Sequence, residues 1–284
     1  MAATRYFLGG NTACGFVSFY GGFCRGADDF LWVIKGGPGC GKSSFMKTIG
    51  KAAEDAGLDV EYVPCSGDPD SLDGVYIPKL RTGYVDGTAP HVIEAVTPGA
   101  ASLYLDLGRF YDRIALRGER RAIEQLQTRC RACYRAAYKR LAAFGDASCA
   151  VEATAAHRKR FARAITCRGL VTLPPPNGAV QMTDEAELAR LAARPGAVLY
   201  QDPLRPEKTE AVFLPDEARY ARLPDALMPD LSDVFAHLSQ AKALHDELEA
   251  VYNPYVDFAR IYALANTHVF RLLHENPVVS ETEM

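Results

Sequence analysis

The residues most able to do chemistry lie between positions 36 and 44. Gly36, Gly41, Lys42 and Ser43 have the spacing Gly-x4-Gly-Lys-Ser of a Walker A motif. In such a loop the glycines let successive backbone N–H groups point at an anion, and the lysine reaches the β- and γ-phosphates of a nucleotide. The serine hydroxyl is a ligand for Mg²⁺. The predicted nucleotide-binding residues, called the phosphate loop below, are Gly36, Gly37, Pro38, Gly39, Cys40, Gly41, Lys42, Ser43 and Ser44.

The segments on either side of the phosphate loop have the order that this chemistry requires. The apolar run at 30–34 is typical of a buried parallel strand. After the loop, Phe45, Met46 and Ile49 recur at helical spacing, and Gly57 is a helix stop signal. A helix that begins here adds its positive N-terminal end to the anion site. The sequence therefore predicts binding of a nucleoside triphosphate, with ATP and Mg²⁺ as cofactors.

An acidic residue at the end of a neighbouring strand usually completes the metal site. The short strand predicted at 81–86 ends in Asp86, and we expect Asp86 and Ser43 to hold Mg²⁺. The alternatives are Asp68 or Asp70, in a loop that follows the strand predicted from Val60. Carboxylates in that loop, Asp73 included, are equally typical of turn chemistry.

The predicted catalytic residues extend beyond the phosphate loop. His91 follows Asp86 closely and would orient water or bind substrate. Arginines recur at roughly i, i+4 from Arg109 and Arg113 onward, and one of them would close over the γ-phosphate. The same arginines would also suit a nucleic-acid backbone or ion pairs with the more acidic second half. The catalytic prediction comprises Lys42, Asp86, His91, Arg109 and Arg113.

Composition describes an ordinary globular protein: 284 residues, 48% hydrophobic and 24% charged, with a net charge of −3 that argues against general nucleic-acid binding. The first residues lack the apolar core of a signal peptide, and no apolar run is long enough to span a bilayer. We therefore expect a cytoplasmic protein without membrane contact. Its eight cysteines are then expected to be reduced thiols.

A weak internal repeat indicates the architecture. Residues 7–19 align without gaps on 161–173, Val60-Glu-Tyr62 aligns on Val198-Leu-Tyr200, and residues 73–78 align on 210–215. Both copies end in predicted helices, at 117–144 in the first and at 231–251 and 255–274 in the second. Between 173 and 198 the second copy has a short helical patch at 184–194 but no Walker motif.

The predicted fold is α/β: a P-loop NTPase with a mostly parallel sheet and a helical insertion, followed by a degenerate second repeat. We expect a nucleotide-binding repeat with the helical insertion at 1–154. The degenerate repeat, at 155–284, lacks the Walker loop and ends in a helical hairpin. The second repeat should bind no nucleotide and should serve as a packing partner or regulator of the first.

Several strings resemble those of an uncharacterised bacterial family known only as P-loop ATPases or ATP-binding proteins, mainly from Gram-positive bacteria. The resembling segments are 5–12, 15–19, Lys35–Ser44, 68–73, Asp86-Gly-Thr-Ala-Pro-His91 and 98–100. Members of that family commonly carry a Walker loop in both repeats, and this chain departs by lacking the second. The resemblance implies ATP binding but names no substrate.

Three functions follow from these observations. The first is an ATP-binding P-loop NTPase that hydrolyses ATP with Mg²⁺. The second is a small-molecule or nucleotide kinase, in which the loop at 68–73 and the arginine helix would hold a small-molecule acceptor. The third is a non-catalytic, ATP-dependent switch that recruits a protein partner through its second half.

Overall fold

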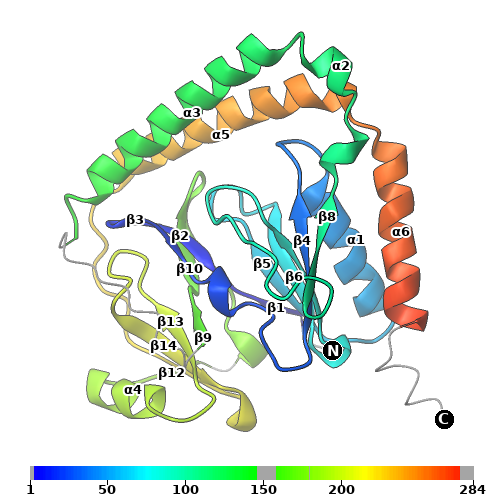
Figure 1. Ribbon diagram of the computed structural model, residues 1–284. Helices are drawn as coiled ribbons and strands as arrows, with labels where there is room; N and C mark the ends of the chain where they lie inside the picture. The colour runs from blue at the N-terminus through cyan, green and yellow to red at the C-terminus, as the bar shows by residue number, and fades with distance from the viewer. Residues whose placement is uncertain (1–2, 146–157, 179, 276–284) are drawn as a thin grey trace.

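The computed structural model describes residues 3–145, 158–178 and 180–275. The protein is α/β, with two mixed β-sheets and a pair of long helices that extends across both of them (Figure 1). The boundary predicted between residues 154 and 155 lies outside the described residues.

The first sheet carries the predicted phosphate loop. Its strand order is β1-β5-β6-β7-β4-β8, in which β1–β5, β7–β4 and β4–β8 pair in parallel and the β5–β6–β7 meander is antiparallel. The strands are β1 (Ala3–Arg5), β4 (Phe30–Lys35), β5 (Val60–Pro64), β6 (Leu72–Ile77), β7 (Thr82–Asp86) and β8 (Ser102–Asp106). The strands predicted at 30–34 and 81–86 correspond to β4 and β7.

The second sheet has the order β12-β15-β14-β13-β9, again with parallel outer pairs and an antiparallel meander between them. Its strands are β9 (Arg158–Arg160), β12 (Val180–Met182), β13 (Val198–Gln201), β14 (Thr209–Leu214) and β15 (Arg219–Arg222). Two hairpins lie beside the sheets: β2 (Gly9–Thr12) with β3 (Gly15–Ser18), and β10 (Arg163–Thr166) with β11 (Gly169–Thr172). Phe7 and Phe161 join the halves by two backbone hydrogen bonds of 3.0 and 2.8 Å.

The α-helices are α1 (Lys42–Asp55), α2 (Arg113–Leu116), α3 (Arg120–Leu141), α4 (Glu185–Ala192), α5 (Ser232–Tyr252) and α6 (Phe258–His274). Helices α3 and α5 form an antiparallel pair. Their shared core contains Leu126, Cys133, Ala241, Leu244 and Leu248. Because both helices bury an apolar stripe against the other, neither depends on helix propensity alone.

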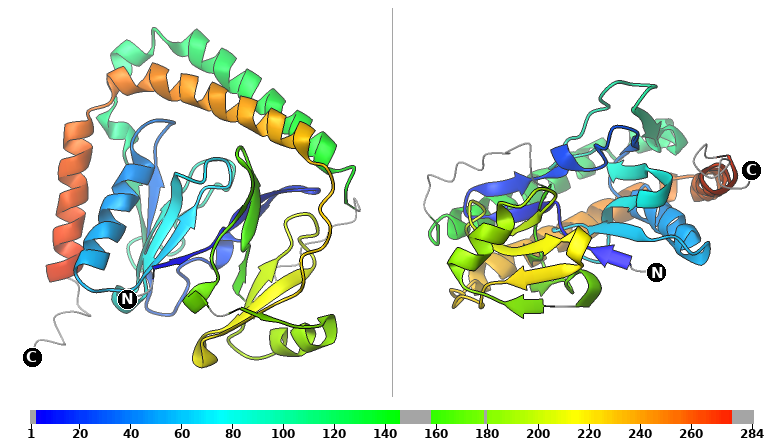
Figure 2. Two further views of the ribbon diagram at one scale, coloured as in Figure 1. Left: turned by 180° about the vertical axis from the view of Figure 1, so that it is seen from behind. Right: turned by 90° about the horizontal axis from the view of Figure 1, so that it is seen from below.

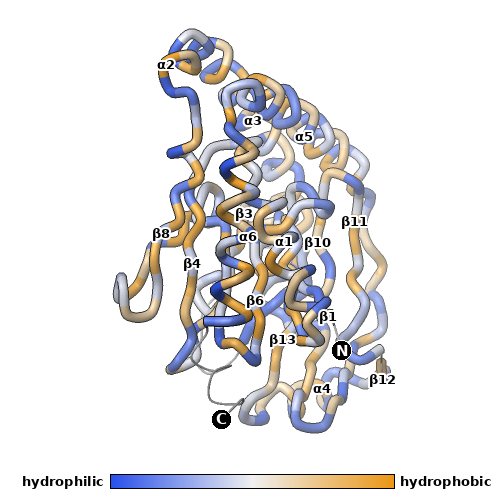
Figure 3. Tube along the Cα trace, turned by 90° about the vertical axis from the view of Figure 1, so that its right-hand side faces the viewer, coloured by the Kyte–Doolittle hydropathy of each residue, from blue (hydrophilic) through white to orange (hydrophobic). Residues whose placement is uncertain are grey.

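The two faces of β4 lie in different cores because side chains alternate along a strand. Ile34 contributes to a core with α1 and α6, and Trp32 packs against that core, whereas Leu31 and Val33 face a core shared with the second half. Seen from behind, α1 and α6 lie side by side along the first sheet (Figure 2). Figure 3 shows hydrophobic and hydrophilic residues mixed along α6, as expected for a helix with one buried face.

Helix α6 therefore completes the core of the first sheet, although it lies at the other end of the chain. Its Ile261, Ala265 and Leu272 are buried with α1 residues such as Phe45 and Ile49. None of the helices within the described ranges combines the length and apolar composition that a membrane span requires.

The cysteines are not all free thiols. Cys24, Cys40, Cys65, Cys130, Cys133 and Cys167 are free, but Cys14 is disulfide-bonded, so the expectation of eight reduced cysteines is wrong. Disulfide bonding depends on which sulfur atoms the fold brings together, and sequence spacing does not report that. Cys149 lies outside the described residues.

Candidate functional site

The phosphate loop joins the end of β4 to the start of α1, as predicted. Gly39 and Gly41 have φ angles of +68° and +81°, in the left-handed region that favours glycine. Gly41 is the N-cap of α1 and provides no side-chain hydrogen bond to the first turn. The positive end of α1 is therefore not neutralised by an acidic or capping side chain.

Lys42 folds back over the phosphate loop. Its Nζ donates hydrogen bonds to the carbonyl oxygens of Gly36 and Gly37, at 3.0 and 2.9 Å. The same Nζ lies 3.6 Å from Oδ2 of Asp86. The lysine thus contacts the two parts of the site that sequence analysis predicted separately.

Asp86 reaches the phosphate loop because β7 lies next to β4 and runs parallel to it. In that register Asp86 is opposite Ile34, so the carboxyl ends of both strands meet at one edge of the sheet. Oδ1 of Asp86 accepts hydrogen bonds from the backbone N–H and hydroxyl of Thr88, at 2.8 and 2.6 Å. These bonds fix the carboxylate with its second oxygen toward Lys42.

Ser43 lies beside β6, and its Oγ accepts a hydrogen bond of 2.9 Å from the backbone N–H of Leu72. Because Asp73 follows Leu72 in β6, this hydrogen bond places Asp73 close to the phosphate loop. Asp73, Asp86 and His91 each offer one ligand atom, and these atoms all lie within 4.8 Å of one another. The fold therefore brings the predicted residues Asp86 and His91 together. A third residue, Asp73, joins them, although sequence analysis did not distinguish it from the other carboxylates of the loop at 68–73.

Asp73 is almost fully buried, at 7% exposure. Burial raises the pKa of its carboxyl group, and Asp86 nearby raises it further, while His91 and the hydroxyl of Tyr20 oppose the shift. The Tyr20 hydroxyl donates to Oδ2 of Asp73 at 3.0 Å. The signal available in the sequence was an acidic residue among the apolar residues of β6.

Residues of the second half cover the outside of the phosphate loop. A Cβ atom on Gly39 would lie 2.7 Å from Oδ1 of Asn253 and 3.2 Å from Cα of Glu249, at the end of α5. A Cβ atom on Gly37 would lie 3.5 Å from Cε1 of Tyr252, at the end of α5, and 2.8 Å from the hydroxyl of Tyr111, a residue of the first half. Glycine is thus needed at position 39 for both close packing and loop shape, whereas at position 37 the constraint is the close approach of Tyr111. The sequence patterns did not predict these contacts.

Cys40, in the middle of the phosphate loop, is buried at 1% exposure. Burial raises the pKa of its thiol, although Lys42 acts in the opposite direction. The thiol is therefore held in the less reactive, protonated form.

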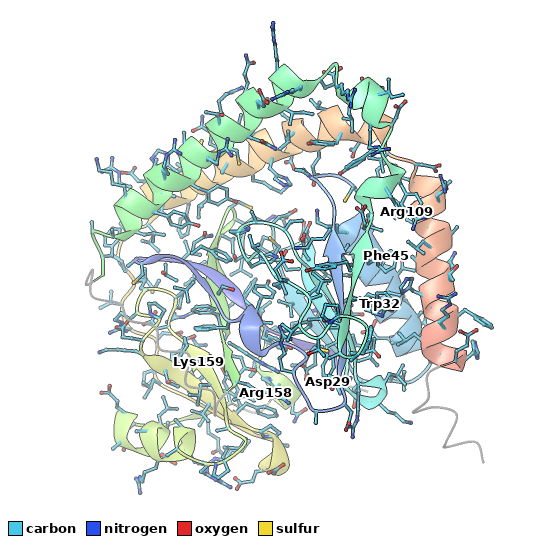
Figure 4. All side chains as sticks on the ribbon, viewed as in Figure 1. Asp29, Trp32, Phe45, Arg109, Arg158 and Lys159 are labelled. Atoms are coloured by element: carbon cyan, nitrogen blue, oxygen red, sulfur yellow. The ribbon has the colours of Figure 1, made fainter. Side chains whose placement is uncertain are left out.

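The predicted arginines Arg109 and Arg113 lie on the protein surface, outside the pair formed by Lys42 and Asp86. Arg109 follows β8 at the same sheet edge as the phosphate loop (Figure 4), and its guanidinium stacks over the ring of Phe110 at 5.3 Å. Arg109 and Arg113, the first residue of α2, are both exposed. Further along the chain, Arg129 and Arg140 lie 4.0 and 3.6 Å from carboxylate oxygens of α5. The ion pairs with the second half that sequence analysis considered are thus formed by the later arginines.

Asp68 and Asp70, the alternative metal ligands, form ion pairs with basic side chains of the second half. Lys242 of α5 lies 3.5 Å from Asp68, and Arg168 pairs with Asp70. Neither carboxylate belongs to the cluster of Asp73, Asp86 and His91.

Comparisons of the chain with protein-family models, with curated proteins and with solved structures gave no match.

Proposed function

We propose that this chain is a P-loop NTPase that binds ATP with Mg²⁺ at the phosphate loop and hydrolyses the nucleotide. One observation carries the proposal: Lys42 of the phosphate loop and Asp86 of the adjacent parallel strand converge, with Nζ and Oδ2 at 3.6 Å. A lysine and an acidic strand end in this arrangement are the two charged parts of a P-loop site.

The residues present fit ATP and Mg²⁺. The left-handed turns at Gly39 and Gly41 and the uncapped start of α1 suit a phosphate group that accepts hydrogen bonds from backbone N–H groups. Lys42 would exchange its bonds to loop carbonyls for the phosphates. Ser43 and Asp86 would hold Mg²⁺, which supplies a positive charge against the β- and γ-phosphate oxygens. ATP use is the reason to place the protein in the cytoplasm.

We also propose that the two halves are copies of one unit, as in the bacterial P-loop family that the sequence resembles. The supporting observation is that β1-β5-β6-β7-β4 and β9-β13-β14-β15-β12 share their order and the direction of every pairing. When the alignment of 7–19 on 161–173 is extended backward, Thr4 corresponds to Arg158. Thr4 lies opposite Glu61 and Arg158 lies opposite Val198, so the strand registers match Glu61 with Val198. The sequence alignment that paired Val60 with Val198 is therefore shifted by one residue.

The second copy lacks an anion site at the corresponding place. Strand β12 ends at Met182, and α4 begins at Glu185 after only a short connection. The carboxylate of Asp184 accepts a hydrogen bond from the backbone N–H of Glu187 at 2.7 Å, so an acidic side chain occupies the start of this helix. We therefore expect one nucleotide per chain.

A second candidate function, the ATP-dependent switch, is favoured by the contact of α5 with the phosphate loop. Because Asn253 and Glu249 touch Gly39, nucleotide at the loop would act directly on the position of α5. Helix α5 packs along α3, so a change at the loop would reach the far end of this pair.

Phosphate release from purified full-length chain with ATP and Mg²⁺, without any acceptor, tests the proposal. Steady release that requires both ATP and Mg²⁺ supports the NTPase. Tight ATP binding without turnover would favour the switch. Turnover that appears only with an added metabolite would favour the kinase, whose acceptor would have to displace the ion pairs now held by Asp68 and Asp70.

A further inference from the structure

Asp73, Asp86 and His91 form a cluster with the ligand types of a metal site. No hydrogen bond between the three side chains, within the described residues, accounts for their proximity. Their ligand atoms lie within 4.8 Å of one another. Asp73 accepts hydrogen bonds from the hydroxyl of Tyr20 and the thiol of Cys65, and Asp86 from Thr88, so no hydrogen bond joins the three to one another within the described residues. Two ligands of one ion with bonds of about 2.1 Å are separated by roughly 3 to 4 Å. The observed spacing therefore needs only a small contraction to enclose an ion.

His91 provides the second, independent observation. Both of its ring nitrogens, Nδ1 and Nε2, are shielded from solvent, and neither has a hydrogen-bond partner in the described structure. The ring is held in place by stacking on Tyr20, with ring centroids 4.4 Å apart. A neutral imidazole carries one N–H donor and one acceptor lone pair, and a protonated one carries two N–H donors, so leaving both nitrogens without a partner is unfavourable. A metal ion within the cluster would satisfy one of them.

The second half shows how the same fold neutralises a buried carboxylate without a metal. In the proposed alignment Glu210 of β14 corresponds to Asp73, and it is buried to the same extent, at 7% exposure. Arg163 pairs with Glu210 at 2.6 Å. The residue that corresponds to Arg163 in the first half is Gly9, and no lysine or arginine of the described chain forms an ion pair with Asp73.

We propose that Asp73, Asp86 and His91 bind one divalent first-row transition-metal ion, such as Zn²⁺ or Mn²⁺. Imidazole and carboxylate together are a donor set for these ions, whereas Mg²⁺ prefers oxygen ligands alone. Three protein ligands leave coordination positions for water or a phosphate oxygen. The site adjoins Ser43 through the bond from Leu72, but it requires no nucleotide, so it does not rest on the proposed function.

Metal binding to the full chain tests this inference. Protein freed of metal with a chelator is dialysed against Zn²⁺, Mn²⁺ or Mg²⁺ without nucleotide, and bound metal is counted by mass spectrometry. We expect one Zn²⁺ or Mn²⁺ per chain, bound at least tenfold more tightly than Mg²⁺. His91→Gln and Asp73→Asn should each weaken binding at least tenfold, whereas His274→Gln, on an exposed histidine, should leave it unchanged. Co²⁺ absorption bands that disappear in His91→Gln would show the imidazole as a ligand.

The inference is overturned if the wild-type chain binds no stoichiometric transition metal, or if His91→Gln binds it as well as the wild type. Circular dichroism of each variant separates loss of a ligand from loss of the fold, and Asp73→Asn provides a second test if His91→Gln does not fold. Lys42→Ala separates the two proposals: it should weaken ATP binding roughly ten- to hundredfold but retain the transition metal. Unchanged ATP binding in folded Lys42→Ala would count against the phosphate loop, and loss of the transition metal in that variant would count against a metal site that needs no nucleotide.

Discussion

Lys42 and Asp86 face each other across the end of two adjacent parallel strands, with Nζ and Oδ2 3.6 Å apart and side chains only 12% and 13% exposed. The pairing keeps two charges in a poorly hydrated place, where each has a partner. A phosphate and its metal ion would separate the two and give each a new partner. Under the proposed function, nucleotide binding would therefore exchange one pair of charges for two new pairs.

Lys42→Ala tests the phosphate loop. Loss of a charge-assisted contact to phosphate costs on the order of 1.5–3 kcal/mol, which corresponds to roughly ten- to hundredfold weaker ATP binding. The measurement is calorimetric titration with ATP and Mg²⁺. Lys51→Ala is the matched control, because Lys51 lies on the same helix and pairs with Asp55 at the surface. Unchanged affinity in a folded Lys42→Ala protein would contradict nucleotide binding at this loop.

Asp86→Asn tests the metal ligand. The amide keeps the size of the side chain but removes the charge that would hold Mg²⁺ in the proposed site, so we expect kcat to fall at least tenfold while ATP affinity changes much less. Steady-state phosphate release and ATP titration supply the two numbers. Asp70→Asn, at an exposed ion pair with Arg168, should behave like the wild type. The opposite pattern, with Asp70→Asn impaired and Asp86→Asn active, would show that the loop at 68–73 holds the metal.

His268 predicts a pH dependence of stability. Burial lowers the pKa of this histidine to about 4, below its usual value of 6.5, with a further contribution from Arg271. The unfolded chain then takes up a proton between pH 6.5 and 4 while the folded chain does not, so stability falls over this interval as pH falls. The loss amounts to at most about 3 kcal/mol.

Urea titrations of the wild type and His268→Gln at pH 7, 6, 5 and 4 measure the effect. Trp32 and Phe45, labelled in Figure 4, surround the imidazole at 4.8 and 5.4 Å between ring centroids, and the Tyr84 hydroxyl lies 3.2 Å from Nδ1. The variant should be less stable at pH 7 and should lose less stability on acidification. Parallel pH curves for the two proteins would show that His268 does not titrate in this range.

Removal of the second half tests the core. A fragment of residues 1–154 retains the phosphate loop but loses α6, which buries Ile261, Ala265 and Leu272 beside α1. We expect it to be insoluble or unfolded, as judged by circular dichroism. A fragment that unfolds cooperatively and turns over ATP like the full chain would contradict this view.

Ile261→Ala examines the same contact in the full chain. Truncation of a buried isoleucine costs about 2–5 kcal/mol of unfolding free energy. Tyr262→Ala, at the next position of α6 and 51% exposed, should cost much less. Similar losses in both variants would mean that the packing of α6 on α1 contributes little.

Local elements were readable from the residues alone. The apolar run at 30–34, the glycines of the phosphate loop and the spacing of Phe45, Met46 and Ile49 each specify a conformation through neighbours in the chain. The helices predicted at 117–144, 231–251 and 255–274 were found at α3, α5 and α6 for the same reason. The strand predicted at 81–86 also ends in Asp86, which is why a position at the end of a strand beside β4 was expected for this residue.

Contacts between distant segments depended on the tertiary structure. Strand β6 turns back antiparallel to β5, and only this places Asp73 beside Asp86 and His91. The return of α5 and α6 to the first sheet brings Asn253 to Gly39 and Ile261 to α1. Periodicity and spacing report the conformation of one segment, whereas these contacts arise when apolar faces far apart in sequence are buried together. The sequence alone therefore determined the phosphate loop, and the packing of the two halves decided what surrounds it.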